Sequence, residues 1–199
     1  MSVPVRGRST RHKSNKLILV VDGPSEKVYF DYFVGLNPHL KVIVKPITNQ
    51  SSYEKTLDYC NKLLSNKTIE LLKGDRFAVV ADVDGASLDE VQHFENKCLK
   101  RDIALYVSNP CFEVWLVQHY KEVTKWYSPS ELNQELTRLI KRPYVKSEGI
   151  PMDDQRIQTA IENGFRSIPS EDTCNSDCVS CGKSASTLHF LVEMMISFR

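Results

Sequence analysis

The stretch FAVVADVDGAS, Phe77 to Ser87, joins an uninterrupted apolar run to two aspartates that stand one residue apart. A short apolar run bounded by turn-forming residues is typical of a strand that is buried on both faces, as in a parallel sheet. The run KLILVV, Lys16 to Val21, has the same character and ends at Asp22-Gly23-Pro24. The sequence therefore predicts two buried strands that each lead directly into carboxylates.

Further strands and helices alternate with these two strands through residue 120. Two more strands are predicted at Leu40–Ile47 and Ile103–Val107. Three of the intervening segments have apolar residues at helical spacing and follow a serine that can cap a helix: Ser25, Ser52 and Ser87. This alternation predicts an α/β fold with a mostly parallel sheet flanked by helices.

Composition divides the chain into three parts. Residues 1–15 form a polar, basic arm, and residues 16–125 carry the alternating strands and helices. Residues 126–199 form a helical extension with a cysteine-rich loop, and its last helix is expected at Leu188–Phe198. A chain of 199 residues is expected to form one domain, or one domain with a small appendage.

The basic arm has a strongly uneven charge relative to the rest of the chain. Five of the 26 Lys and Arg residues, and none of the 25 Asp and Glu residues, lie in residues 1–21. The remainder is therefore mildly acidic. A basic arm on an acidic body suits contact with a polyanion such as nucleic acid. A disordered, solubilising tail is the alternative.

The sequence predicts a cytoplasmic protein without a membrane partner. No apolar run approaches the ~18 residues of a membrane span, and the N-terminus lacks the pattern of a signal peptide. The chain contains six cysteines. In a reducing compartment they are expected to be free thiols or metal ligands.

Two strand ends carry four carboxylates: Asp22, Glu26, Asp82 and Asp84. Functional groups gather at the carboxyl ends of parallel strands, so we expect these acids at one edge of the sheet. Their mutual repulsion would favour a hard divalent cation such as Mg²⁺ or Mn²⁺. Asp82 and Asp84 can share a site because residues two apart in an extended segment point the same way. The alternative is that each acid only caps a helix or a turn.

These motifs resemble the Toprim domain, because VDGPSEKVYFDYF followed by VVADVDG is similar to its strand ending in E-G and its strand ending in D-x-D. The closer resemblance is to RloB-like proteins, through SNPCFEVWLVQH (Ser108–His119) and STLHFLVEMM (Ser186–Met195). The resemblance implies a Toprim/Rossmann-like core and a metal-dependent nuclease of bacterial restriction or anti-phage defence loci. Related Toprim proteins of the OLD type are nucleases.

Carried over by position, the resemblance places the Toprim glutamate at Asp22, the next acid at Glu26 and the D-x-D pair at Asp82 and Asp84. Asp22 is one methylene shorter than glutamate, which leaves open a reorganised metal site or a loss of activity. The implied substrate is nucleic acid, with DNA, RNA and tRNA as candidates. The chain has no P-loop, so an ATPase or another defence-system subunit is a candidate partner.

Three residues have candidate roles in the chemistry beside the aspartates. Glu26 could bind the metal or orient water. His119 is a candidate proton donor or phosphate contact, and Glu113 is a candidate catalytic acid in the same motif. The alternative is that both are structural, with Glu113 bound to backbone amides at the start of a helix.

Two alternatives to a nuclease remain open. The first is a non-catalytic, Toprim-like subunit that binds nucleic acid or a partner protein and regulates it. The second is a phosphatase or phosphoacceptor domain that uses Asp22. The segment DGPSE lacks the D-x-D-x-T pattern of one large phosphatase class, which argues against the second alternative.

The spacing C-x₃-C-x₂-C of Cys174, Cys178 and Cys181 predicts a structural Zn²⁺ site. The fourth ligand would be His189 or a cysteine such as Cys60 or Cys98. Residues 167–186 contain few apolar side chains, so zinc would supply folding energy that burial does not. A loop with free thiols is the alternative.

Overall fold

The computed structural model describes residues 14–47, 52–65, 69–172 and 174–198. Its sheet has the strand order β2-β1-β3-β4-β5, in which the first four strands are parallel and β5 is antiparallel. The strands are β1 (Asn15–Val21), β2 (Leu40–Pro46), β3 (Arg76–Asp82), β4 (Ala104–Asn109) and β5 (Ala185–Ser186). This sheet confirms the predicted fold class. The basic arm lies almost entirely outside the described residues.

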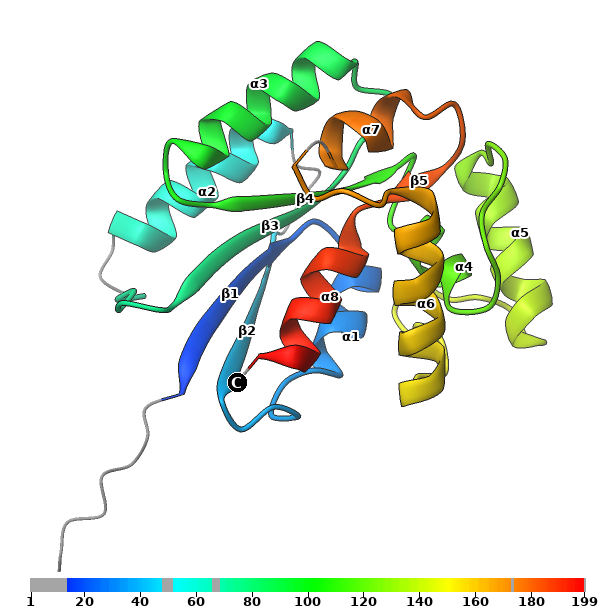
Figure 1. Ribbon diagram of the computed structural model, residues 1–199, viewed down its shortest axis with the longest axis horizontal. Coiled ribbons are helices and arrows are strands. Elements are labelled where there is room, and N and C mark those ends of the chain that lie inside the picture. Colours follow the sequence, from blue (N-terminus) through cyan, green and yellow to red (C-terminus); the bar gives the residue numbers. More distant parts are fainter. Residues whose placement is uncertain (1–13, 48–51, 66–68, 173, 199) are drawn as a thin grey trace, which may run out of the picture.

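Helices cover both faces of the sheet. The described residues form α1 (Pro24–Asp31), α2 (Tyr53–Ser65), α3 (Leu88–Leu99), α4 (Glu113–Gln118), α5 (Pro129–Ile140), α6 (Asp154–Ser167), α7 (Cys174–Ser180) and α8 (Leu188–Ser197). Figure 1 shows α2, α3 and α7 on one face and α1 and α8 on the other, with α4, α5 and α6 beside them. Because both faces are covered, β1 and β3 each contain a continuous apolar run, Leu17–Val21 and Phe77–Ala81. Among these helices none has the length and apolar character needed to cross a membrane.

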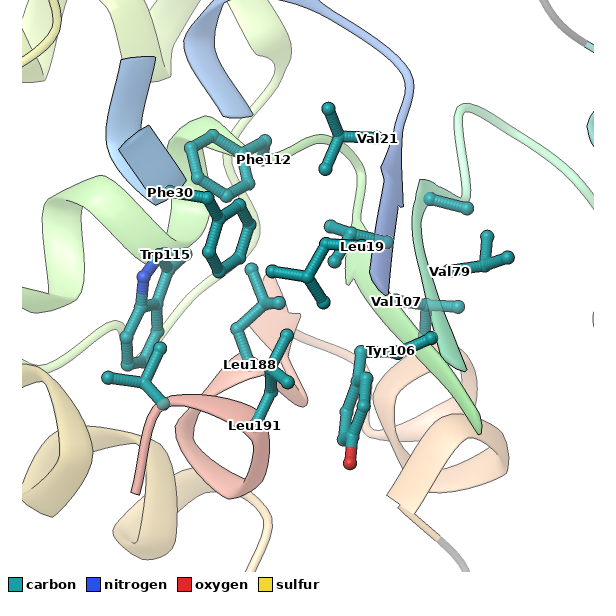
Figure 2. Close-up of a cluster of buried hydrophobic side chains, with 14 of the residues drawn as sticks. Leu19, Val21, Phe30, Val79, Tyr106, Val107, Phe112, Trp115, Leu188 and Leu191 are labelled. Carbon is teal, nitrogen blue, oxygen red and sulfur yellow. The ribbon is translucent and has the colours of Figure 1, made fainter. Parts of the chain in front are cut away.

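The hydrophobic core is built around β1 and β3. Leu17 to Val21 are fully buried, and so is Val79 of β3. Figure 2 shows Leu19 of β1 near Phe30 of α1 and Leu188 of α8. The C-terminal extension therefore shares one hydrophobic core with the α/β part, because α8 packs in the same layer as α1.

The helices that follow β1 and β3 lie on opposite faces of the sheet. The chain passes from β1 to β2 through α1 on one face, and from β3 to β4 through α3 on the other face. Where connections diverge in this way, the carboxyl ends of the two adjacent strands bound a crevice in which parallel sheets bind ligands. Here those strands are β1 and β3, which end beside Asp22 and at Asp82.

The predicted helix starts are correct at Ser87 and wrong at Ser25. Ser87 forms a capping box with Glu90 at the start of α3. Helix α1 begins before Ser25, at Pro24, and its N-cap is Gly23. Proline suits a first helical position because its φ is preset and an amide hydrogen there would have no partner within the helix. The Ser25 side chain is thereby available for contacts inside the molecule.

The segment predicted as a cysteine-rich loop contains helix α7, so the prediction of an irregular loop is wrong. Polar contacts to the sheet hold this helix. The buried Asn175 amide donates to the Leu105 carbonyl at 3.0 Å, and the Thr187 hydroxyl donates to Asn175 Oδ1 at 3.2 Å. Asn109, at the end of β4, donates to the Cys178 carbonyl at 3.1 Å. Hydrogen bonds to β4 therefore order a segment that has few apolar side chains.

Candidate carboxylate site

A cavity of about 860 Å³ opens at the carboxyl ends of β1 and β3. The acids that line it are Asp22, Glu26, Asp82, Asp84 and Glu113. The lysines that line it are Lys27, Lys55 and Lys146. The structure thus brings together acids from three motifs that are far apart in the sequence.

The turn between β1 and α1 positions two of these acids. Asp22 follows the last residue of β1, and Glu26 lies in the first turn of α1 with only 4% of its surface exposed. The Glu26 carboxylate lies against Gly23, where an added Cβ would come within 2.8 Å of Glu26 Oε2. A side chain at position 23 would displace this carboxylate, so the close approach requires glycine.

The turn after β3 positions another pair, in a way that differs from the prediction. Asp82 is the last residue of β3, whereas Asp84 has a left-handed backbone with φ of +44°. The Asp84 amide donates to the Pro110 carbonyl at 2.9 Å, which fixes the turn against the segment that follows β4. The extended geometry predicted for this pair is therefore wrong, although both aspartates line the cavity.

The carboxylates of the acid cluster are buried close to one another, and both effects disfavour their ionised forms. Asp82 Oδ1 is buried and has no hydrogen-bond partner among the described residues. Burial raises the pKa of Asp82 well above its usual value, and the charges of Glu26, Glu113 and Asp22 raise it further. Burial also raises the pKa of Glu26 to about 7, assisted by Glu113 and Asp22 and opposed by a hydrogen bond from its own amide. A cation in the cavity would relieve this repulsion.

Glu113 is held by three donors at the edge of the cavity. Its Oε1 accepts hydrogen bonds from the Ser25 hydroxyl and the Tyr144 hydroxyl, and pairs with the Lys146 ammonium, each at 3.1 Å. Burial alone would raise the pKa of Glu113, but Lys146 and a hydrogen bond from Cys111 lower it below its usual value. Glu113 is therefore an ionised carboxylate with a fixed position.

Sequence reasoning missed Tyr144 and Lys146. Both lie between α5 and α6, in a segment that shares no strand or helix with the acids. The Tyr144 hydroxyl also lies 3.0 Å from the Ser25 hydroxyl, and burial raises the Tyr144 pKa above its usual range, so the phenol stays protonated. No spacing in the sequence links this segment to the strand ends, and only its tertiary packing reveals the contact.

His119 does not line the cavity. It is buried, with Nδ1 2.9 Å from the Trp115 carbonyl and Nε2 3.2 Å from the Tyr29 hydroxyl. Burial lowers the pKa of His119 to about 4, so the neutral ring donates through Nδ1 and accepts through Nε2. This position fits the structural alternative rather than a proton donor or a phosphate contact.

The cysteines of the predicted zinc site face different surroundings. Cys178 is buried, and its Sγ lies 3.8 Å from the Val107 carbonyl. Cys181 is exposed, and its Sγ lies 3.3 Å from the Lys183 carbonyl. The side chain of Cys174 lies outside the described residues, so the zinc site stays a prediction.

The candidate fourth ligands of that site are buried elsewhere in the fold. The two ring nitrogens of His189 lie 3.2 Å and 2.9 Å from the carbonyls of Ser186 and Ile168, and burial lowers the His189 pKa to about 4. Cys60 and Cys98 are fully buried in α2 and α3, where burial raises the pKa of each thiol to about 12. These contacts fit core packing for all three residues.

The side chains of the described residues, as they lie here, do not form a ready metal centre. No three His, Cys, Asp or Glu residues in this part of the chain are grouped so that they could hold a metal ion. At the carboxylate cavity, Lys146 supplies positive charge to Glu113 instead. Cation binding would therefore require the cavity acids to turn toward one another.

Comparison with known proteins identifies a family for this chain. The model of a family described as RloB-like protein matches residues 17–195, from the first core strand to the last helix. No curated protein and no solved structure gives a significant match to the chain. The matched range includes all five cavity acids and Lys146.

Proposed function

The chain belongs to the RloB-like protein family, and from that premise we propose that it cleaves phosphodiester bonds of nucleic acid with the aid of a divalent cation. The observation that carries the proposal is the gathering of five carboxylates around one cavity at the carboxyl edge of the sheet. Carboxylates in such positions hold the cations of many phosphoryl-transfer enzymes. A role in a bacterial defence locus, with an ATPase or another subunit as partner, belongs to the same proposal.

The donor set fits a hard cation such as Mg²⁺ or Mn²⁺, which prefers oxygen ligands. Asp82 offers a buried oxygen without a hydrogen-bond partner among the described residues, and Asp22 and Asp84 line the same cavity. We assign these three aspartates as the ligands. When bound, the cation would neutralise charge on the scissile phosphate and make a nearby water more nucleophilic.

The other residues of the cavity would act on water and substrate. Glu26, held against Gly23, would orient the attacking water and accept its proton. Lys146 would leave Glu113 for a non-bridging oxygen of the phosphate and neutralise its charge. Glu113 keeps Lys146 at the cavity when no substrate is present.

Lys146→Ala is expected to lower kcat/KM for cleavage by about 10- to 100-fold, because the phosphate loses a charged donor. The expected loss is below that of a fully enclosed donor because the Lys146 side chain is 54% exposed. Lys146→Arg should restore part of the activity, since it keeps the charge. Lys62→Ala removes an exposed lysine of α2 and is the matched control. Equal kcat/KM in wild type and Lys146→Ala would contradict the role given to this residue.

A non-catalytic role is the second candidate, and one observation favours it. Lys146 is paired with Glu113, and no metal-binding group of three ligands is formed among the described residues. A cavity of this kind could bind a phosphate through its lysines without cutting the chain. The protein would then be a nucleic-acid- or partner-binding regulatory subunit.

Purified full-length protein separates the two candidates. It should be incubated with single-stranded and duplex DNA and with RNA, including tRNA, in the presence of Mg²⁺ or Mn²⁺. We expect cleavage products that disappear when EDTA replaces the cation. Substrate that is bound but intact in every condition, including addition of the other proteins of the locus, would favour the non-catalytic role.

A further inference from the structure

The loop between α4 and α5 presents a half-exposed tryptophan from an anchored backbone. Trp126 is 50% exposed, although both of its neighbours are held by the buried Ser184. The Lys125 carbonyl accepts a hydrogen bond from the Ser184 amide at 3.2 Å, and the Tyr127 amide donates to the Ser184 hydroxyl at 2.9 Å. The exposed indole is therefore not the consequence of a loosely held loop.

Two lysines lie over the ring of Tyr127, the residue that follows Trp126. Lys125 Nζ lies 4.8 Å from the centre of the Tyr127 ring, and Lys121 Nζ lies 5.3 Å from it. Lys121 is paired with Glu135 at 2.6 Å, so the exposed Lys125 carries the charge that is available to a ligand. Lys125 also interacts with the charge of Glu131. The Glu131 carboxylate itself accepts hydrogen bonds from Ser128 in the capping box of α5. The loop thus presents an exposed tryptophan, Trp126, that directly follows an exposed lysine, Lys125.

The loop lies at the same edge of the sheet as the carboxylate cavity. Ser184 directly precedes β5, where Ala185 pairs with Asn109 at the end of β4. Ser108 of β4 pairs on its other side with Asp82. Adjacent strands are about 4.8 Å apart, so the anchor of the loop is on the order of 10 Å from Asp82. That distance spans a few nucleotides at ~3.4 Å per stacked nucleotide.

We propose that Trp126 and Lys125 form a subsite that stacks an unpaired base of a single-stranded segment next to the cleaved phosphate. The inference rests on the proposed function, whose substrate class it narrows. An exposed aromatic face stacks on any base, and an adjacent ammonium contacts the backbone phosphate. Bases inside a duplex have both faces covered, so the subsite favours single strands, loops and ends. Lysine is depleted from protein–protein interfaces, which favours nucleic acid over a protein as the occupant.

The chain carries its own reporter for this contact. It has two tryptophans, of which Trp115 is fully buried and Trp126 is half exposed. The probe is a mixed-sequence single-stranded RNA of about 16 nucleotides, the upper site size of common single-strand binders. It is titrated into the full chain in EDTA, so that no cleavage occurs. We expect quenching of tryptophan emission, which Trp126→Phe should abolish while keeping most of the affinity.

Trp126→Ala is expected to weaken binding of this RNA by about 5- to 100-fold, the range for loss of one stacked base. Leu99→Ala is the control, because Leu99 is an apolar residue that is 64% exposed at the C-terminal end of α3, toward the other edge of the sheet. A duplex of the same sequence should compete poorly. Unchanged affinity in Trp126→Ala, or equal competition by the duplex, would overturn the inference.

A parallel cleavage assay with Mg²⁺ or Mn²⁺ distinguishes failure of this inference from failure of the proposed function. If wild type and Trp126→Ala cleave the RNA with equal kcat/KM, the nuclease proposal stands and the subsite is refuted. If Trp126→Ala weakens binding but no condition gives cleavage, the subsite is supported and the nuclease proposal fails. Tight binding of another protein that Trp126→Ala abolishes, without any RNA binding, would assign the surface to a protein partner and refute the subsite.

Discussion

Asp82→Asn is expected to abolish nucleic-acid cleavage while making the cation-free protein more stable. Asp82 is central to the acid cluster and is proposed to bind the cation directly. Loss of its charge should lower kcat/KM by at least about 100-fold, because removing even a residue that only hydrogen-bonds to a metal ligand costs up to about 100-fold. The same charge is costly without a cation, because Asp82 Oδ1 is buried without a hydrogen-bond partner in the described structure. Removing this buried charge should raise the unfolding free energy of the cation-free protein by about 1–3 kcal/mol.

Two measurements check this prediction on the same preparations. Cleavage is followed with Mg²⁺ or Mn²⁺, and thermal unfolding is followed in EDTA, where an increase of a few degrees is expected. Asp58→Asn, at an exposed position of α2, is the matched control and should change neither quantity. If the Asp82→Asn variant cleaves as well as wild type, Asp82 is not a ligand of the catalytic cation. A lower melting temperature would show that Asp82 has a stabilising partner.

The second large effect is a rise in stability on cation binding that grows with pH. Folding raises the Glu26 pKa from 4.5 to about 7 because Glu26 is buried near Glu113 and Asp22. The folded chain therefore binds more protons than the unfolded chain in this window, and the stability of the cation-free protein falls as pH rises from 4.5 to about 7. A cation needs ionised ligands, so Mg²⁺ or Mn²⁺ should stabilise the protein most above pH 7. At 100 times its Kd a cation adds about 2.7 kcal/mol.

Thermal unfolding in EDTA and in Mn²⁺, from pH 5 to pH 8, tests this effect. Glu26→Gln should flatten the fall in stability, and Glu54→Gln on the exposed surface of α2 is its control. Lys146, which faces the same acids, limits the size of the effect by neutralising Glu113. The buried His119 and His189 act in the opposite direction, because their pKa values are lowered to about 4. The difference between wild type and Glu26→Gln therefore removes the histidine contribution and reports Glu26 together with the part of the Asp82 shift that Glu26 causes. Identical pH profiles for the two proteins would contradict this prediction.

The central strands were predictable because burial on both faces leaves a continuous apolar run. The predicted strands at Lys16–Val21 and Phe77–Ala81 differ from β1 and β3 by one residue at their ends. The position of Asp22 and Asp82 followed from the same run, since each acid stands where the run stops. A parallel sheet then brings strand ends to one edge whatever the details of the turns.

Other parts of the site could not be predicted because they depend on contacts between distant segments. Lys146 meets Glu113 only after the segment between α5 and α6 folds onto the sheet edge, and no periodicity reports that contact. Asp84 reaches the cavity through a left-handed turn rather than an extended strand. Helix α7 is ordered by hydrogen bonds of Asn175, which leave no apolar pattern in the sequence.

Diffraction from crystals soaked in Mn²⁺, measured at the manganese absorption edge, tests directly whether the carboxylate cavity binds a divalent cation. We expect an anomalous peak in the carboxylate cavity, about 2.0–2.6 Å from oxygens of Asp22 and Asp82. The same peak should be absent from Asp82→Asn crystals of unchanged fold. A cavity without a peak, at a Mn²⁺ concentration that supports cleavage in solution, would show that Asp22 and Asp82 do not hold the cation.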